Sequence, residues 1–500
     1  MNRRRFVQTS LAAAIAASLP VSQSFAAILS ASMKVDADIN AVTGDGAEVT
    51  LKRAAVQELG DSLRGNLLLP GHEAYAEARR VLNASIDKHP ALIVQCKGSA
   101  DVKSAVDFAR ESDLLVAVKC GGHSLSGKST CDGGMMIDLS TFRSVRVDPK
   151  SRIAYVSGGS LLADMDHDTM AFGLVTTAGT VSHTGVSGLT LGGGFGRVGR
   201  RFGLALDNVL GIDIITADGK LIHANADENP ELYWGVRGGG GNFGVVTNFD
   251  FRLHPMNREV IGGDVVFPLS EAKSVLSFFA DYAASAPDEL YLDGGISSSP
   301  GRPGGTSLRV CYSGPMSKAS KLIDPIRNAG TPVFDGIRAI DYVALQKSGD
   351  TSDPRARGWY VKSGFASEIT PEMIDDILYG FKEDPEREMT VAWQHAGGEI
   401  GRVASDATAF AHRHVKHDTL MLMRWPVDID SASHVRWLKE YWATVEPHTR
   451  GFYTNDASSD VSQQKLHRNY GGNYDRLLAL KNKYDPTNLF RLNANIVPTV

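Results

Sequence analysis

The stretch Lys119-Cys120-Gly121-Gly122-His123-Ser124-Leu125-Ser126-Gly127 decides how the rest of the sequence is interpreted. It follows an apolar run, residues 114–118, that predicts a short buried strand. Glycines let a ligand approach the backbone closely, and successive free N–H groups in such a loop can face an anion. We therefore expect His123 in a loop that binds something phosphorylated or flat. The alternative is a glycine-rich turn with an incidental histidine.

Two further glycine clusters follow within the next part of the chain. They are residues 178–196, AGTVSHTGVSGLTLGGGFG, and residues 237–244, RGGGGNFG. A large ligand with a phosphate segment explains three such clusters better than turns alone. Residues 194–199 also match the pattern GxGxxG, which in an NAD site must directly follow a strand. Here it follows a loop rich in glycine and threonine, so we reject NAD binding.

Composition limits the classes of protein that remain. The chain has 500 residues, 43% of them hydrophobic and 22% charged, which is ordinary for a globular protein of two to four units. The net charge of −5 predicts no general attraction to nucleic acid or to an anionic membrane. The spacing of the four cysteines assigns no disulfide pairs, and the absence of CxxC and HExxH motifs predicts no metal site.

The N-terminus is typical of an export signal, residues 1–26. Arg3 and Arg4 precede an apolar run over residues 11–19, and residues 24–26 fit a cleavage site. The arginine pair resembles a twin-arginine signal, although the flanking residues also allow the general secretory route. The run is too short for a permanent membrane helix, and no other stretch is long and apolar enough. We expect a periplasmic or secreted protein without a stable membrane anchor.

Hydrophobic periodicity divides the mature chain into an N-terminal arm, two domains and a returning C-terminal segment. The arm covers residues 27–65, the domains cover 66–256 and 257–450, and the segment covers 451–500. Strands are predicted at residues 91–96, 114–118, 135–139, 153–157, 211–216, 221–224, 288–296 and 306–312. Helices are predicted after caps at Asp101 and Ser160, the second with Leu161, Met165 and Phe172 on one face, and around residues 272–282, 435–445 and 474–483.

The three glycine clusters, together with residues 484–490, YDPTNLF, and the closing Asn493-x-Asn495, resemble a known family. They are similar to the FAD-linked oxidases of the vanillyl-alcohol oxidase superfamily, in the berberine-bridge-enzyme-like branch. The resemblance implies an α+β fold. Its PCMH-type FAD-binding domain has two subdomains closed by the C-terminal segment, and its substrate domain has an antiparallel sheet backed by helices.

The resemblance also implies how FAD is held. In this family the histidine of the first glycine loop carries the flavin on its 8α-methyl group, a role that falls on His123. Many members add a bond from a cysteine in the second cluster, where this sequence has Val181. We therefore expect a single covalent bond. A neutral histidine is a competent nucleophile.

The same motifs supply the other expected cofactor contacts, of which His183 is either a flavin contact or a loop cap. They are Gly121, Gly122, Ser124, Gly127, Val181, Ser182, His183, Gly185, Gly188, Gly192, Gly193, Asn242, Gly244, Val246, Tyr453, Asn455, Asn493 and Asn495.

Tyr453 is the preferred catalytic base, because residues 451–455 match the strand that the family lays over the flavin. The alternative is a core tyrosine. An unperturbed tyrosine is a poor base at neutral pH, so the site would have to lower its pKa. His395 and Glu399 are second choices.

These features predict an exported flavoenzyme that oxidises a hydroxyl-bearing small molecule, such as a sugar or a secondary-metabolite alcohol. Dioxygen or another acceptor would take the electrons. An amine or ring-forming oxidase on the same scaffold is an alternative, and so is a non-catalytic periplasmic ligand-binding protein.

Overall fold

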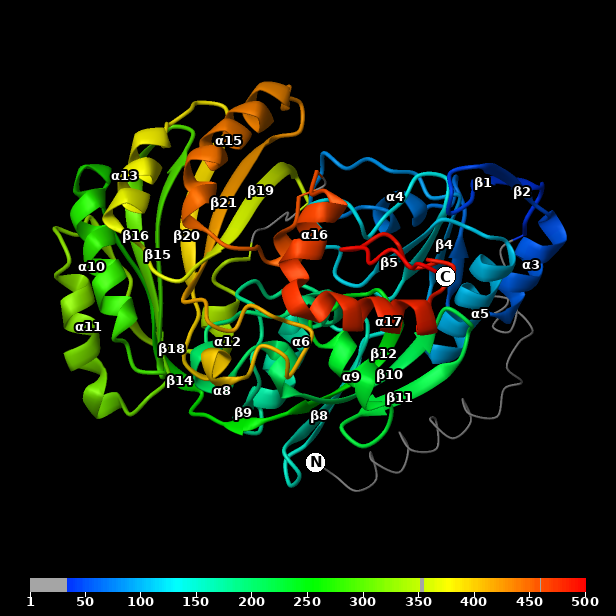
Figure 1. Ribbon diagram of the computed structural model, residues 1–500, viewed down its shortest axis with the longest axis horizontal. Helices are drawn as coiled ribbons and strands as arrows, with labels where there is room; N and C mark the ends of the chain where they lie inside the picture. Colours follow the sequence, from blue (N-terminus) through cyan, green and yellow to red (C-terminus); the bar gives the residue numbers. More distant parts are fainter. Residues whose placement is uncertain (1–33, 351–354, 459) are drawn as a thin grey trace, which may run out of the picture.

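The computed structural model describes residues 34–350, 355–458 and 460–500, so the predicted export signal lies outside the described residues. Three main sheets form the body of these residues. Figure 1 shows the largest sheet at one end of the molecule and the two smaller sheets, with the C-terminal helices across them, at the other. The α+β prediction is confirmed.

The first sheet has the strand order β3-β4-β6-β5. Its strands are β3 (Asn66–Leu68), β4 (Leu92–Gln95), β5 (Val116–Lys119) and β6 (Met135–Asp138). β4 and β5 both run parallel to β6, which lies between them, and α5 (Ser99–Glu111) makes the crossover. The buried face of α5 consists of Val102, Ala105, Val106 and Ala109, which have the helical spacing seen in the sequence.

Both predicted helix caps are wrong. Asp101 lies inside α5, and its carboxylate accepts hydrogen bonds from the amides of Lys97 (2.8 Å) and Arg64 (2.9 Å), so the helix begins earlier. Ser160 precedes α6 (Leu162–Met170), but its hydroxyl donates to the Ser144 carbonyl, while Asp164 accepts from the Leu161 amide.

The predicted N-terminal arm is also wrong for the residues that the structure describes. Residues 39–62 form β1 (Ile39–Val42), β2 (Glu48–Leu51) and α3 (Arg53–Ser62). Val35 and Val56 are buried in the same apolar cluster as Val94 of β4. These elements are short and their apolar faces are narrow, so periodicity gave little signal.

The second sheet is antiparallel with the order β11-β10-β12-β8-β7. Its strands are β7 (Val145–Asp148), β8 (Ile153–Ser157), β10 (Val209–Thr216), β11 (Leu221–Asn225) and β12 (Gly244–Arg252). Helices α7 (Val186–Gly192), α8 (Gly199–Phe202) and α9 (Pro230–Val236) accompany it, and the short strands β9 (Leu174–Val175) and β13 (His254–Pro255) pair beside it. The GxGxxG match at residues 194–199 follows helix α7 and a loop, not a strand.

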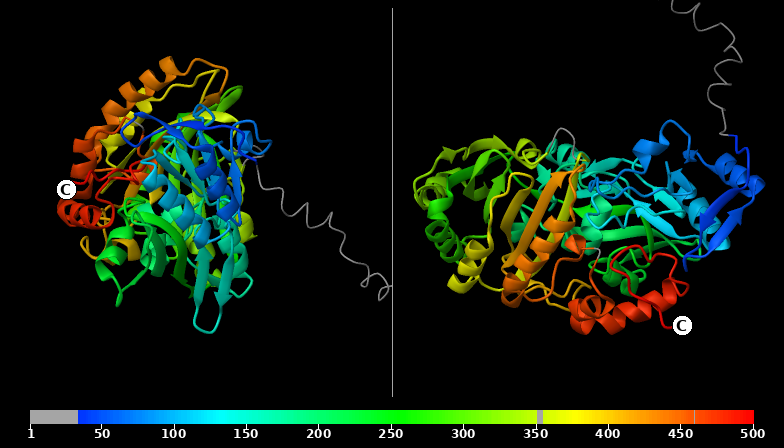
Figure 2. Two further views of the ribbon diagram at one scale, coloured as in Figure 1. Left: turned by 90° about the vertical axis from the view of Figure 1, so that its right-hand side faces the viewer. Right: turned by 90° about the horizontal axis from the view of Figure 1, so that it is seen from above.

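The third sheet has the order β17-β14-β16-β15-β20-β21-β19, and β18 also pairs with β14. Its strands are β14 (Glu259–Pro268), β15 (Leu290–Ser299), β16 (Arg302–Tyr312), β17 (Phe334–Asp335), β18 (Arg338–Asp341), β19 (Arg357–Ala366), β20 (Glu388–His395) and β21 (His417–Pro426). Four helices cover one face: α10 (Ala272–Ala284), α11 (Ala319–Arg327), α13 (Pro371–Gly380) and α15 (Ala432–Val445) (Figure 1, Figure 2). The antiparallel sheet backed by helices is confirmed.

The C-terminal segment returns to the first two sheets through α16 (Gln463–Tyr470) and α17 (Tyr474–Tyr484). Lys481 and Asp485 form a fully buried ion pair at 2.6 Å, and Lys481 also donates to the carbonyl of Asn242. Asp485 accepts from the amides of Leu489 and Phe490. The YDPTNLF motif is therefore a turn, held by the buried Asp485, that fixes the segment against the third glycine cluster.

All four cysteines are free thiols. Among the described residues, no helix combines the length and apolar character needed to cross a membrane.

Candidate active site

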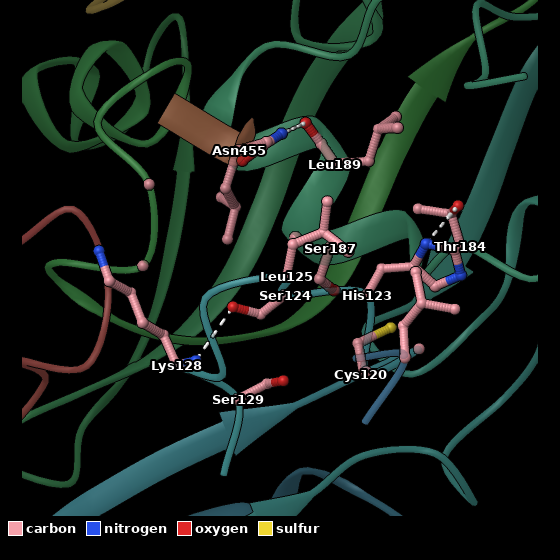
Figure 3. Close-up of a pocket in the computed structure, with 18 of the residues that line it drawn as sticks. Cys120, His123, Ser124, Leu125, Lys128, Ser129, Thr184, Ser187, Leu189 and Asn455 are labelled. Carbon is pink, nitrogen blue, oxygen red and sulfur yellow. Dashed lines mark hydrogen bonds between the residues drawn. The ribbon is translucent and has the colours of Figure 1, made fainter. Parts of the chain in front are cut away.

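One cavity of about 450 Å³ lies where the glycine-rich loops, the third sheet and the C-terminal segment meet. Figure 3 shows side chains from the first loop and from the second glycine cluster converging on it, with Asn455 entering from the C-terminal segment. Most residues expected to contact the cofactor line this cavity: Gly121, Gly122, His123, Ser124, Val181, His183, Gly185, Gly188, Gly244, Val246, Tyr453, Asn455 and Asn493.

In this cavity His123 has a neutral, half-buried imidazole. Its Nε2 lies 2.5 Å from Nδ1 of His183, and its Nδ1 lies 3.3 Å from the hydroxyl of Thr184 (Figure 3). Burial, assisted by the nearby His183 and Arg355, lowers the pKa of His123 to about 3. A neutral imidazole keeps the lone pair that a nucleophile needs.

Glycines shape the cavity in two different ways. A Cβ on Gly188 or Gly241 would meet nothing within 4 Å, so their backbone is open to a ligand. A Cβ on Gly185 would lie 2.5 Å from the sulfur of Cys120, so Gly185 lets the second cluster pack on the first loop. Ser124 accepts a hydrogen bond from the Lys128 amide at 3.0 Å and closes that loop (Figure 3).

Six of the expected cofactor contacts do not line the cavity: Gly127, Ser182, Gly192, Gly193, Asn242 and Asn495. A Cβ on Gly193 would lie 2.9 Å from the ring of Tyr453, so glycine at this position leaves room for the tyrosine ring. Asn242 donates to the Ala494 carbonyl (3.1 Å) and accepts from the Ile496 amide (2.9 Å), which ties down the C-terminus. The motif glycines and asparagines therefore include structural residues that composition alone cannot separate from binding residues.

Tyr453 lies on the cavity wall with two hydrogen-bond donors on its oxygen. The Gly194 amide and the Asn455 side chain both donate to it at 2.8 Å. Burial raises the pKa of Tyr453 nevertheless, and the neighbouring Asp456 adds to the increase. The expected lowering of its pKa is not found in the chain alone. Residues 451–455 also form no strand, since Gly451 has a φ of +66° and residues 454–456 form a 3-10 turn.

The second-choice bases, His395 and Glu399, lie away from the cavity, which corrects that expectation. His395 is buried in the core, where its Nε2 lies 3.1 Å from the Ala283 carbonyl and its ring stacks on His417. Glu399 forms a surface ion pair with Arg402. Neither side chain is placed to contact a ligand in the cavity.

The wall formed by the third sheet was missed from the sequence. Leu420, Leu422 and Arg424 of β21 line the cavity, whereas Met421 and Met423 point into the core of that domain. The same wall includes Trp359 and Gln394. The signal was the alternation along residues 420–424, but nothing in the sequence indicated which face met the first domain.

Asp456 is a further cavity residue that the sequence did not indicate. Burial raises the pKa of this carboxyl to about 7. The buried Asp418 carboxyl, whose oxygens have no hydrogen-bond partner, has its pKa raised by burial and by Asp456. Burial therefore favours the protonated form of both carboxyls, of which Asp456 lines the cavity.

The cavity residues fit a flavin nucleotide. Ser129 Oγ and Asn493 Oδ1 line the cavity, are buried, and have no protein hydrogen-bond partner. Buried polar atoms are normally satisfied, so a ligand with both acceptors and donors is the natural partner. The open backbone at Gly188 and Gly241 accommodates a phosphate group. Within residues 34–350, 355–458 and 460–500, no group of three His, Cys, Asp or Glu residues is placed to bind a metal ion.

Comparison with known proteins identifies the same cofactor. Residues 90–225 match the FAD binding domain family, and residues 453–497 match the family described as berberine and berberine like. An FAD-linked oxidoreductase of Dictyostelium discoideum is 34% identical over 448 residues, which cover 89% of this chain and 97% of that protein.

Two further relatives have named substrates. The chitooligosaccharide oxidase of Gibberella zeae is 26% identical over 482 residues, 90% of this chain and 96% of that protein. The crystal structure of 6-hydroxy-D-nicotine oxidase from Arthrobacter nicotinovorans superposes with a TM-score of 0.80 at 27% identity, covering 88% of this chain and 99% of that one. Shared fold, motifs and length show that this chain is an FAD-linked oxidoreductase of the berberine-bridge-enzyme-like family, within the vanillyl-alcohol oxidase superfamily.

Proposed function

We propose that this protein is an exported oxidase or dehydrogenase that oxidises a hydroxyl-bearing small molecule, with its FAD bonded once, to His123. One observation carries the proposal: a single cavity brings together the neutral imidazole of His123 and the phenol of Tyr453. FAD, when bound, accepts a hydride from the substrate. The protein then has to anchor the cofactor and take the proton of the substrate hydroxyl.

The anchoring role falls on His123. Val181, which takes the place of the second covalent residue of many family members, also lines the cavity and carries no nucleophile. Among the described lining residues, Cys120 carries a thiol that could form a second bond, but burial raises the pKa of this thiol to about 11. A protonated thiol is a poor nucleophile. Single attachment at His123 is therefore the arrangement that these residues favour.

The proton-accepting role falls on Tyr453. The two N–H groups that donate to its oxygen would stabilise a phenolate, in the manner of an oxyanion hole. They act against the burial that raises its pKa. The tyrosine would take the substrate proton as the hydride leaves.

The cavity wall that the third sheet forms indicates the substrate class. Trp359, Leu420 and Leu422 present apolar surface, while Gln394 and Arg424 present the polar groups. Arg424 is already paired with Glu388 and lies over the Trp359 ring. A ring-bearing alcohol with few polar groups suits this wall better than a long oligosaccharide.

Amine oxidation is the second candidate, because Asp456 adds a carboxyl to the cavity and one relative oxidises 6-hydroxy-D-nicotine. Anaerobic bleaching of the flavin separates the two. Matched pairs of ring-bearing alcohols and amines would be added without an electron acceptor. We expect the alcohols to bleach the flavin; bleaching by the amines alone would establish the second candidate instead.

Covalent attachment has a direct test. We expect the yellow colour to stay with the acid-precipitated protein, and peptide mass spectrometry to find FAD on the peptide that contains His123. His123→Ala should bind FAD that acid releases completely. A flavin on any cysteine, or a parent protein that releases all its FAD in acid, would contradict single attachment.

A further inference from the structure

Among the residues that the structure describes, His183 is the side chain that contacts His123 through a short nitrogen–nitrogen distance. Its Nδ1 lies 2.5 Å from Nε2 of His123, and the ring centroids are 4.6 Å apart at an angle of 44°. Two neutral imidazoles at this distance share one hydrogen between these nitrogens, so one ring donates and the other accepts. The sequence left His183 as either a flavin contact or a loop cap.

The other contact of His123 is compatible with His123 as the donor. Its Nδ1 is 3.3 Å from the Thr184 hydroxyl, a long hydrogen bond, whereas the Nε2 contact is short. A proton on Nε2 satisfies the short contact, with the Thr184 hydroxyl turned toward the Nδ1 lone pair. Nδ1 is then the unprotonated nitrogen, its lone pair engaged only by the long Thr184 contact, and a partner on the opposite nitrogen sets this tautomer.

The surroundings of His183 suit it to accept that proton. Burial lowers the pKa of His183, so its ring is neutral at neutral pH and one of its nitrogens carries a lone pair. The Asp350 carboxylate opposes this lowering, and it is held by the amide of Ser182, the residue before His183 (3.0 Å). A nearby negative charge stabilises the imidazolium that forms when His183 takes a proton.

We propose that His183 is the positioning residue for flavin attachment: it fixes the Nδ1-nucleophile tautomer of His123 and takes the Nε2 proton as the bond forms. This inference rests on the proposed covalent attachment. The new bond joins His123 Nδ1 to the 8α-carbon of the flavin, which loses one hydrogen as a proton. His183 receives the second proton, and the two electrons released remain on the flavin until dioxygen, reduced to hydrogen peroxide, or another two-electron acceptor takes them.

The test measures attachment and not turnover. Full-length apoprotein, produced under riboflavin limitation, is mixed with FAD, and the flavin that remains with acid-precipitated chain is followed over time. His183→Ala and His183→Gln are compared with the parent. His167→Gln is the matched control, because His167 pairs with Asp168 on the surface of α6. His123→Ala gives the baseline without attachment.

We expect both His183 variants to bind FAD but to attach it at least about 10²-fold more slowly, the usual contribution of a proton acceptor. Added imidazole should restore attachment in His183→Ala and not in His123→Ala, which a merely structural role would not produce. If the alanine variant does not fold, slow attachment in the folded glutamine variant carries the test.

If either folded variant attaches FAD at a rate within about threefold of the parent rate, the role of His183 is overturned. Such a loss falls well short of the contribution of a proton acceptor. The role is also overturned if imidazole does not accelerate FAD attachment in a folded His183→Ala variant. In both cases the parent still attaches FAD, and the proposed function stands. A parent that releases all its FAD in acid would instead overturn covalent attachment, and the role of His183 with it.

Discussion

At the scale of single residues, the surroundings of the Tyr453 oxygen shift the pKa of this phenol in opposite directions. The N–H groups of Gly194 and Asn455 favour its ionised form, while burial and Asp456 favour the neutral form and raise the pKa overall. Its ring also packs edge-on against Phe195, with centroids 5.2 Å apart. Tyr453 is thus both a packed aromatic residue and a candidate proton acceptor, and mutation can separate the two roles.

Tyr453→Phe keeps the ring and removes the oxygen. We expect anaerobic flavin reduction by substrate to slow by about 10²–10⁴-fold, because a general base typically contributes that much. The buried Gly194 amide loses its acceptor, which costs about 1–3 kcal/mol of stability, so the flavin spectrum must confirm a folded protein. Tyr470→Phe, at another buried tyrosine of the C-terminal segment, is the control, and its flavin should be reduced at the parent rate. A loss of less than about threefold at Tyr453 would make it a packing residue.

At the scale of elements, helix α6 of the first domain contacts helix α12 (Tyr342–Gln346) of the second through a buried polar group. The Gln346 amide donates to Asp166 (3.1 Å) and to the Gly179 carbonyl (2.9 Å), and its oxygen accepts from Arg197 (2.7 Å). Burial raises the pKa of Asp166 to about 7. Since the folded state holds this proton more tightly than the unfolded state, Asp166 makes the contact between the two domains sensitive to pH.

Asp166→Asn should therefore change how stability depends on pH. The contribution of Asp166 is complete below its unfolded pKa of 3.8 and is lost as pH rises through about 7. The loss has a slope of at most about 1.4 kcal/mol per pH unit. We expect the Tm of the variant, relative to the Tm of the parent, to rise from about pH 5 to about pH 7 and to change no further above that pH.

Asp168→Asn, two residues along the same helix and partly exposed, is the control and should show no such trend. A Tm difference for Asp166→Asn that is constant across this range would contradict a raised pKa.

At the scale of the whole molecule, the C-terminal segment completes the first domain after the chain has formed the second. Its buried Lys481–Asp485 pair and the apolar side chains of α17 pack beneath the third glycine cluster. All four cysteines are free, so no disulfide links these distant segments. Because no disulfide is needed to join these segments, the cavity can form and bind FAD without an oxidising compartment.

Export in the folded state is the corresponding prediction. Arg3 and Arg4 lie outside the described residues, and the prediction rests on their place before the apolar run. Replacing both by lysine should leave the FAD-loaded precursor in the cytoplasm, as measured by fractionation and by the size of the uncut chain. Lys34→Gln, beyond the predicted cleavage site, should export normally. Unchanged export of the double variant would indicate the general secretory route.

Much of the fold and part of the site follow from local sequence. The loop at residues 119–127 and the two later glycine clusters locate the cofactor cavity, because loop geometry depends on the residues of the loop itself. β4 begins with the apolar run at residues 92–94 and β12 contains the β-branched run at residues 245–247, and a short window detects such runs. The roles of His123 and Val181 were assigned by resemblance to the family, and they remain predictions.

Other features depend on segments far apart in the chain, and only the tertiary structure decided them. His395 stacks on His417 inside the second domain, whereas Leu420 and Arg424 reach the cavity, although all belong to adjacent strands of one sheet. Which face of a strand meets another domain depends on docking, not on alternation. The raised pKa of Tyr453 likewise comes from burial by distant residues. Sequence determined where the cofactor loops lie; packing decided which side chains surround them and in which protonation state.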